Sequence, residues 1–241
     1  MADIAVVTGA SGGIGAAIAK AIAEKAEGQM RLALHYRGNR GAAEALSAEL
    51  PGSFLIHADL GSDEGRKALL SAVLKEGSPY ILINNAGIDK PHEPALMIQE
   101  SSFDSIIDVN LRTPAFLMRD FGKEMASSGS GVIINVSSIL ARKALIGSAL
   151  YRASKAALEE LTKQFAAELG PRGVRVNAVA PGFIETAMTA SIPEEIRGKI
   201  RSEIALGGFG NPGAVAQAVC HLIENEYING AVIPVDGGMS L

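Results

Sequence analysis

The stretch that decides the fold is IAVVTGASGGIGAAIAKAIAEKA, residues 4–26. It begins with an apolar run typical of a strand (4–8), continues through the glycine-rich TGASGGIG (8–15), and ends in a helical pattern. Glycines allow a sharp turn and close approach of the backbone to a ligand, and a helix N-terminus presents free N–H groups and the positive end of the helix dipole. A strand, a glycine loop and a helix in this order indicate a pyrophosphate-binding loop.

The glycine spacing is G-x-x-x-G-x-G, and a glycine loop alone is a weak signal, because an ordinary structural turn is the alternative. Its place between an apolar strand and a helix favours binding of a dinucleotide. We predict that the loop contacts this cofactor through Gly9, Ser11, Gly13, Ile14 and Gly15.

Short apolar runs alternate with helical patterns along the rest of the chain. After the first run, they lie at 31–36, 53–58, 80–84, 132–137, 174–180 and 230–235. The runs are continuously apolar, which is typical of strands covered on both faces in a parallel sheet. We predict an α/β fold: a single Rossmann-type domain over 1–241, with a doubly wound parallel sheet of about seven strands flanked by helices. Ligands bind such sheets beyond the carboxyl ends of the strands.

Composition narrows the class of protein. The chain has 241 residues and a formal net charge of −4, so it lacks the basic surplus of nucleic-acid-binding proteins. Cys220 is the only cysteine, which indicates a reducing compartment. We find neither a signal peptide nor a run long enough to span a membrane. We expect a cytoplasmic protein without a nucleic-acid or membrane partner, and no His–carboxylate spacing suggests a metal site.

The end of the second predicted strand indicates which dinucleotide binds. An acidic residue there would bind the ribose 2′-hydroxyl of NAD, but the sequence reads HYRGNR (35–40). The planar, permanently charged side chain of Arg37 suits a 2′-phosphate, with Arg40 as a second candidate, and this favours NADP(H). The alternative is an ordinary solvated loop. His35 and His57 lie in strand runs and are predicted to be structural.

A tyrosine and a lysine lie four positions apart in YRASK (151–155), and therefore on one face of a predicted helix. Ser138, in NVSS (135–138), ends the preceding strand and faces the same crevice. An ammonium group such as that of Lys155 lowers the pKa of a phenol from its usual ~10, which would make Tyr151 a usable acid at neutral pH. With a nicotinamide cofactor nearby, this set indicates hydride transfer to a ketone. The alternative places Tyr151 in the core and Lys155 in solvent. It does not explain why NVSS and the glycine loop occur in the same chain.

These motifs resemble the short-chain dehydrogenase/reductase family over nearly the whole chain. TGASGGIG, NNAG (84–87), the serine–tyrosine–lysine set and PG (181–182) match in order and spacing. DVNL (108–111), APGFIETAMT (180–189) and GAVIPVDGGMSL (230–241) are most similar to the 3-oxoacyl-(acyl-carrier-protein) reductases. The resemblance implies a homotetramer that reduces a 3-oxoacyl thioester with NADPH in fatty-acid biosynthesis.

The resemblance also implies roles for individual residues. Tyr151 would be the catalytic acid, and Lys155 would bind the nicotinamide ribose and lower the pKa of the tyrosine. Ser138 would orient the substrate carbonyl, and Asn110 would hold a water in a proton relay. The remaining cofactor contacts would be Asp59, Leu60, Asn85, Ala86 and Gly87 toward the adenosine, and Pro181, Gly182, Ile184 and Thr186 toward the nicotinamide. The alternatives are a helix cap for Asp59 and a buried structural amide for Asn110.

The chain departs from the family at the expected docking surface for an acidic acyl carrier protein. Where basic residues are expected, just before the fifth predicted strand, it has the uncharged ASSGSG (126–131). Arg172 lies where a second basic contact is expected. The substrate is therefore either a carrier-bound thioester or a CoA thioester, small ketone, alcohol or sugar of another pathway; a non-catalytic NADP sensor is a third reading.

Glycines near its end and a helical pattern predict that residues 186–211 form a substrate lid. Met188 and Ile192 in this segment either line an acyl channel or pack in the ordinary way. His92 lies near the predicted crevice and either contacts the substrate or is solvated.

Overall fold

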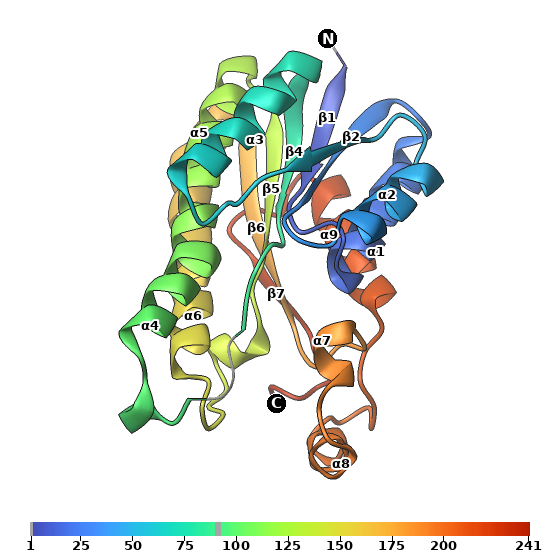
Figure 1. Cartoon of the computed structure of the whole chain (residues 1–241). Helices are drawn as coiled ribbons and strands as arrows, with labels where there is room; N and C mark the ends of the chain where they lie inside the picture. The colour runs from blue at the N-terminus through green and yellow to red at the C-terminus, as the bar shows by residue number, and fades with distance from the viewer. Residues whose placement is uncertain (1, 90–92) are drawn as a thin grey trace.

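Seven parallel strands form one sheet in the computed structural model, which describes residues 2–89 and 93–241 (Figure 1). The strand order is β3-β2-β1-β4-β5-β6-β7. The chain therefore starts in the middle of the sheet, winds outward to β3, and returns to the other side of β1. The strands are β1 (Asp3–Val7), β2 (Met30–Tyr36), β3 (Phe54–His57), β4 (Ser78–Asn84), β5 (Gly131–Val136), β6 (Val174–Pro181) and β7 (Val232–Val235). The predicted doubly wound parallel sheet is confirmed.

Helices cover both faces of the sheet (Figure 1). One layer consists of α1 (Gly13–Ala26), α2 (Arg40–Glu49) and α9 (Pro212–Glu224). The opposite layer consists of α3 (Asp63–Glu76), α5 (Thr113–Ser128) and α6 (Ala149–Leu169), with α4 (Glu100–Ile107) beside α6. Beyond the carboxyl ends of the strands lie α7 (Ala187–Ala190) and α8 (Glu194–Ser202).

The first strand shows why the apolar runs are continuous. Ile4 and Val6 pack into the core under α3, α5 and α6, whereas Ala5 and Val7 pack into the core under α1, α2 and α9. All four are completely buried. Successive side chains of a strand point to opposite faces, so a sheet covered on both faces needs apolar residues at every position.

Two predictions fall on residues whose placement is not described: His92 lies outside the described residues, as does the side chain of Met188. Within residues 2–89 and 93–241, no helix has both the length and the apolar character needed to cross a membrane.

Candidate active site

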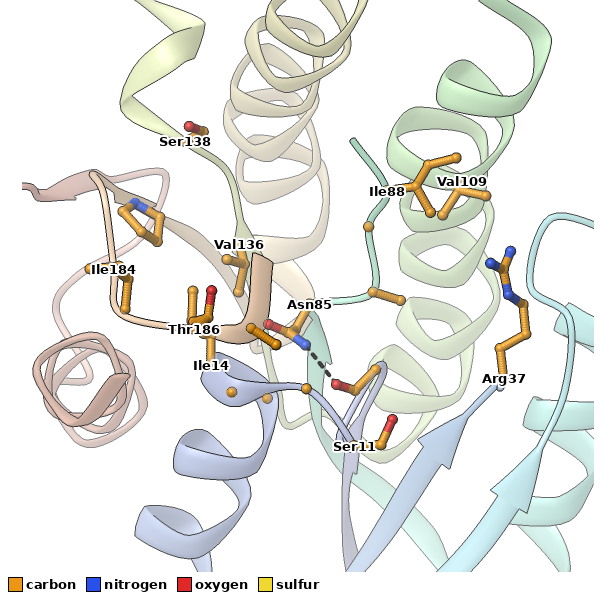
Figure 2. Close-up of a pocket in the computed structure, with 18 of the residues that line it drawn as sticks. Ser11, Ile14, Arg37, Asn85, Ile88, Val109, Val136, Ser138, Ile184 and Thr186 are labelled. Atoms are coloured by element: carbon orange, nitrogen blue, oxygen red, sulfur yellow. Dashed lines mark hydrogen bonds between the residues drawn. The ribbon is translucent and has the colours of Figure 1, made fainter. Parts of the chain in front are cut away.

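A cavity of about 460 Å³ lies at the carboxyl ends of the central strands. This is within the size range of pockets that bind small ligands. Ser138 and Arg37 lie at opposite ends of it (Figure 2). The structure brings together all of the residues predicted to bind the cofactor, since the lining includes Gly9, Ser11, Gly13, Ile14, Gly15, Arg37, Asp59, Leu60, Asn85, Ala86, Gly87, Tyr151, Lys155, Pro181, Gly182, Ile184 and Thr186.

The glycine loop is packed so closely that it has no room for side chains at its critical positions. Gly9 has a φ of +66°, which a residue with a Cβ rarely adopts. A Cβ on Gly15 would lie 2.6 Å from the amide nitrogen of Asn85. That side-chain amide donates to the carbonyl oxygen of Thr8 at 2.9 Å and to that of Gly9 at 3.1 Å, and Figure 2 draws the bond to Gly9. Gly12, the N-cap of α1, makes no side-chain cap hydrogen bond, so the cradle and the first amides of α1 fit a pyrophosphate.

The end of the cavity near β2 and β3 has one arginine in place. Arg37 lines the cavity, whereas Arg40 does not and instead pairs with Glu44 at 2.7 Å on the surface. Asp59 also lines the cavity, and its carboxylate accepts a hydrogen bond from the backbone of Gly61 at 3.1 Å. The alternative in which Asp59 caps the next helix is wrong, because the N-cap of α3 is Ser62.

At the opposite end, the predicted catalytic side chains meet. The ammonium nitrogen of Lys155 donates to the carbonyl oxygen of Val136 at 2.8 Å and lies 5.6 Å from the centre of the Tyr151 ring. Ser138 is buried at the end of β5 and also lines the cavity. The spacing argument for a shared crevice therefore holds for all three side chains.

The pKa values of this pair differ from the prediction. The pKa of Tyr151 is raised to about 12, mainly by burial and also by the carboxylate of Asp89, whereas the hydrogen bond with Ser138 opposes the rise. Burial lowers the pKa of Lys155 to about 8, against the opposing effect of Asp89. The expectation that Lys155 brings the phenol pKa toward neutrality is wrong for the chain itself, because desolvation is the largest effect on both groups. Tyr151 is therefore a protonated phenol at neutral pH.

Asn110 lies behind the cavity. It is 1% exposed, in a π-helical turn (Asp108–Arg112) that interrupts the path from α4 to α5. Its amide accepts from the nitrogen of Ile88 and donates to the oxygen of Ile88, both at 2.8 Å. A Cβ on Gly87 would lie 3.3 Å from Asn110 Oδ1 and 3.6 Å from the Lys155 ammonium nitrogen, so these two side chains flank Gly87. The alternative of a buried structural amide describes these bonds well, and the proton relay stays a prediction.

Polar side chains behind the lining support the end of the cavity that holds Ser138, Tyr151 and Lys155. The Ser137 hydroxyl, next to Ser138, donates to Glu159 at 3.1 Å. The other carboxylate oxygen of Glu159 accepts from Arg142 at 3.1 Å. Glu159 is buried one turn beyond Lys155 on α6, so it links the end of β5 to the helix that carries the tyrosine and lysine.

The sequence reasoning missed further residues of the lining, namely Gly12, His35, Gly38, Gly61, Ile88, Val109, Val136, Ser137, Ala187 and Thr189. Most of them adjoin a predicted residue, so the same motifs contained the signal. His35 was predicted to be structural, and its position at the end of a central strand could have revealed it.

One arginine holds together the segment predicted to be a lid. Arg197 of α8 is largely buried and donates to both carboxylate oxygens of Glu185, at 2.7 and 2.9 Å. It also donates to the carbonyl oxygen of Thr189 at 2.8 Å. Because Thr189 lines the cavity, α8 is tied to the cavity wall. Over the described part of the chain, no cluster of His, Cys, Asp or Glu suits a metal ion.

Comparisons with known proteins agree with this geometry. The family model described as enoyl-(acyl carrier protein) reductase matches residues 9–240. The chain is 37% identical to the 3-oxoacyl-(acyl-carrier-protein) reductase FabG of Staphylococcus aureus strain Mu50, over 99% of this chain and 98% of the relative. A Serratia marcescens short-chain dehydrogenase/reductase mutant superposes with a TM-score of 0.91 at 32% identity, covering 99% of this chain and 98% of that one. A Beutenbergia cavernae protein described as an NAD(P)-dependent gluconate 5-dehydrogenase, with NADP bound at low occupancy, also has a TM-score of 0.91 and 32% identity, covering 98% of this chain and 96% of that one.

Proposed function

Because the chain belongs to the short-chain dehydrogenase/reductase family, we propose that it is an NADPH-dependent oxidoreductase that reduces a 3-oxoacyl thioester to the 3-hydroxyacyl product. One observation carries the proposal: the glycine loop, Arg37 and the Ser138–Tyr151–Lys155 set line a single cavity. The similarity to a 3-oxoacyl-(acyl-carrier-protein) reductase supports the substrate class and a role in fatty-acid biosynthesis. We further propose that the protein is cytoplasmic and forms a homotetramer. Light scattering on the purified protein tests the oligomeric state.

In this proposal, the glycine loop and the N-terminus of α1 would hold the pyrophosphate, and Arg37 would bind the 2′-phosphate. The nicotinamide, when bound, supplies the hydride for the carbonyl carbon. Tyr151, protonated at neutral pH, donates its proton to the carbonyl oxygen, and the Ser138 hydroxyl hydrogen-bonds the same oxygen. Lys155 would bind the nicotinamide ribose, and its charge would stabilise the phenolate that the transfer leaves behind.

The test of the chemistry is Tyr151→Phe, with Tyr227→Phe as the control because Tyr227 is fully exposed. Loss of NADPH absorbance with acetoacetyl-CoA reports reduction. Removing the proton donor should slow turnover by about 10²- to 10⁴-fold and leave the Kd of NADPH nearly unchanged. If the Tyr151 variant turned over at the parent rate, the catalytic assignment would be wrong.

The test of cofactor choice is Arg37→Ala, with Arg40→Ala as the control because Arg40 is exposed and does not line the cavity. Loss of a charge-assisted hydrogen bond should weaken NADPH binding by about 10- to 100-fold and NADH binding much less. Equal losses for the two cofactors would refute the 2′-phosphate role.

The uncharged segment 126–131, at the end of α5 and the start of β5, favours a second candidate: a CoA thioester or another small ketone as substrate. Arg172, exposed after α6, is the remaining candidate contact for a carrier protein. Comparing kcat/KM for an acetoacetyl group on acyl carrier protein and on CoA decides between the two. Arg172→Ala should lower only the carrier-protein value if that protein docks there. Failure to turn over any ketone while binding NADPH would favour the sensor.

We also propose that residues 186–211 act as a lid over the substrate. Thr186, Ala187 and Thr189 line the cavity at its nicotinamide end, and Arg197 ties α8 to the same wall. Closure of such a segment excludes water from the reacting groups.

A further inference from the structure

The buried histidine of β2 connects two functional loops. His35 is 3% exposed and lines the cavity beneath the glycine loop. Its Nδ1 accepts a hydrogen bond from the backbone nitrogen of Gly9 at 3.1 Å, and its Nε2 lies 3.0 Å from the carbonyl oxygen of Ala58. Its own carbonyl oxygen accepts from the nitrogen of Ala10 at 2.9 Å. Residue 35 therefore binds two successive amides of the loop and the chain just before Asp59.

The partners of the ring determine its protonation state. The amide of Gly9 can only donate, so Nδ1 has to be the unprotonated nitrogen. The carbonyl oxygen of Ala58 can only accept, so Nε2 has to carry the hydrogen. The two contacts together require the neutral Nε2–H tautomer of His35.

A second proton on this ring would break its hydrogen bond with the glycine loop. Nδ1–H and the Gly9 N–H would then face each other as two donors, and the Gly9 amide would have to turn away. The carbonyl oxygen of Gly9 is held by Asn85 at 3.1 Å and lies against Gly15, so a displacement of Gly9 reaches the N-terminus of α1.

The groups that face the imidazole come from three segments. The glycine loop, residues 8–15, contributes no titratable side chain. The hydrogen bond to Ala58 raises the pKa of His35, His57 on β3 and Arg37 just after β2 lower it, and Asp59 raises it. Burial is the largest effect, and it lowers the pKa, which keeps the ring neutral under physiological conditions.

We propose that His35 is a positioning residue whose neutral imidazole holds the glycine loop in its cofactor-binding geometry, so that protonation of the ring weakens cofactor binding. The inference rests on the proposed function only in that the loop binds a dinucleotide. It goes beyond that function because it assigns a role to a side chain outside the family's motifs in this sequence. It also sets a lower limit to the pH range in which the cofactor binds well.

The experiment is calorimetric titration of NADP⁺ into the full-length protein between about pH 8 and about pH 5, the range in which imidazoles titrate. The parent, His35→Asn and His221→Gln are compared; His221 is exposed on α9 and serves as the histidine control. Below the pKa of His35, the Kd of the parent and of the control should rise more steeply than that of His35→Asn, by about tenfold per pH unit. The amide oxygen of His35→Asn can accept from Gly9 without titrating, so its Kd should show only the dependence due to the 2′-phosphate.

Parallel Kd curves for the parent and His35→Asn would overturn the inference alone. Absence of NADP⁺ binding by the parent at about pH 8 would overturn the proposed function as well, so the two failures are distinguishable. Nitrogen-15 NMR of the parent keeps the proposal testable if the variant does not fold. The Nε2–H tautomer at neutral pH supports it, and the Nδ1–H tautomer overturns it.

Discussion

Gly15 of α1 is where one added methyl group should damage the cofactor cavity. The new Cβ of Gly15→Ala would lie closest to the carbonyl oxygen of Gly9, and it would lie 2.6 Å from Asn85 Nδ2 and 3.0 Å from the carbonyl carbon of Gly9. Ordinary contacts start at 3.4 Å, so the Asn85 side chain would have to retreat by about 0.8 Å (3.4 minus 2.6). It cannot retreat freely, because it is bonded to the carbonyl oxygens of Thr8 and Gly9. The loop therefore moves with it.

A displacement of about 1 Å in a binding segment can cost about 100-fold in rate, which corresponds to about 2.7 kcal/mol. We therefore expect kcat/KM for NADPH to fall about 100-fold in Gly15→Ala. The fold should survive, because overpacking costs about 1–3 kcal/mol and alanine returns about 1 kcal/mol of helix propensity.

Initial rates with acetoacetyl-CoA and urea unfolding measure the two effects separately. Gly41→Ala in α2 is the matched control, because a Cβ there meets nothing within 4 Å. It should leave kcat/KM unchanged and raise the free energy of unfolding by about 0.5–1 kcal/mol. A Gly15 variant with the parent kcat/KM would refute the close-approach argument.

Three further predictions concern charged groups. The kcat/KM for ketone reduction should be level below about pH 8 and fall about tenfold per pH unit above it, because Lys155, with a pKa of about 8, loses its charge; a level profile up to about pH 10 contradicts this. Arg142→Ala should lower the free energy of unfolding by about 1–2 kcal/mol in urea titrations, because buried Glu159 loses its charged partner; Arg40→Ala, at an exposed pair, should change it far less, and similar losses would count against the argument. Arg197→Ala should raise KM for the ketone about tenfold with little change in KM for NADPH, since the two hydrogen bonds that tie α8 to Glu185 and the one that ties it to Thr189 are lost; equal changes in both would speak against a lid.

The sheet and the clustering of the predicted cofactor residues around one cavity were predictable because both depend on local patterns. Burial on two faces requires an apolar residue at each position of a strand, as in Ile4 to Val7, and the carboxyl ends of parallel strands meet at one edge. The loops after these strands therefore converge wherever they lie in the sequence. Ser138, Tyr151 and Lys155 could be placed together on that basis.

The parts that could not be predicted depend on contacts between distant segments. The pairing of Glu159 with Arg142 and Ser137 depends on where the loop after β5 folds back onto α6. Asn110 lies in a π-helical turn between α4 and α5 and bonds to the backbone of Ile88 in the loop after β4. Neither contact has a spacing that distinguishes it in the sequence.

The pKa values of Lys155 and Tyr151 also could not be predicted from the sequence, and they affect the free energy of unfolding. A four-residue spacing brings Lys155 and Tyr151 together, but the depth of burial decides which protonation states the folded chain favours. Lowering the pKa of Lys155 from 10.5 to about 8 corresponds to about 3 kcal/mol of destabilisation wherever the lysine is charged. The unfolded chain binds the extra proton between about pH 8 and 10.5, so this cost is complete below about pH 8 and is relieved as the pH rises through that window.

Tyr151 behaves in the opposite way. Its raised pKa leaves the free energy of unfolding constant below about pH 10 and lowers it as the pH rises from about 10 to about 12, because the folded chain keeps a proton that the unfolded chain has lost. At neutral pH, the fold therefore holds a charged lysine beside a phenol that keeps its proton. A proton donor needs that state before transfer, and a stabilising cation beside it during transfer. The lysine is thus destabilising to the folded chain over the same pH range in which the proposed reaction requires its charge.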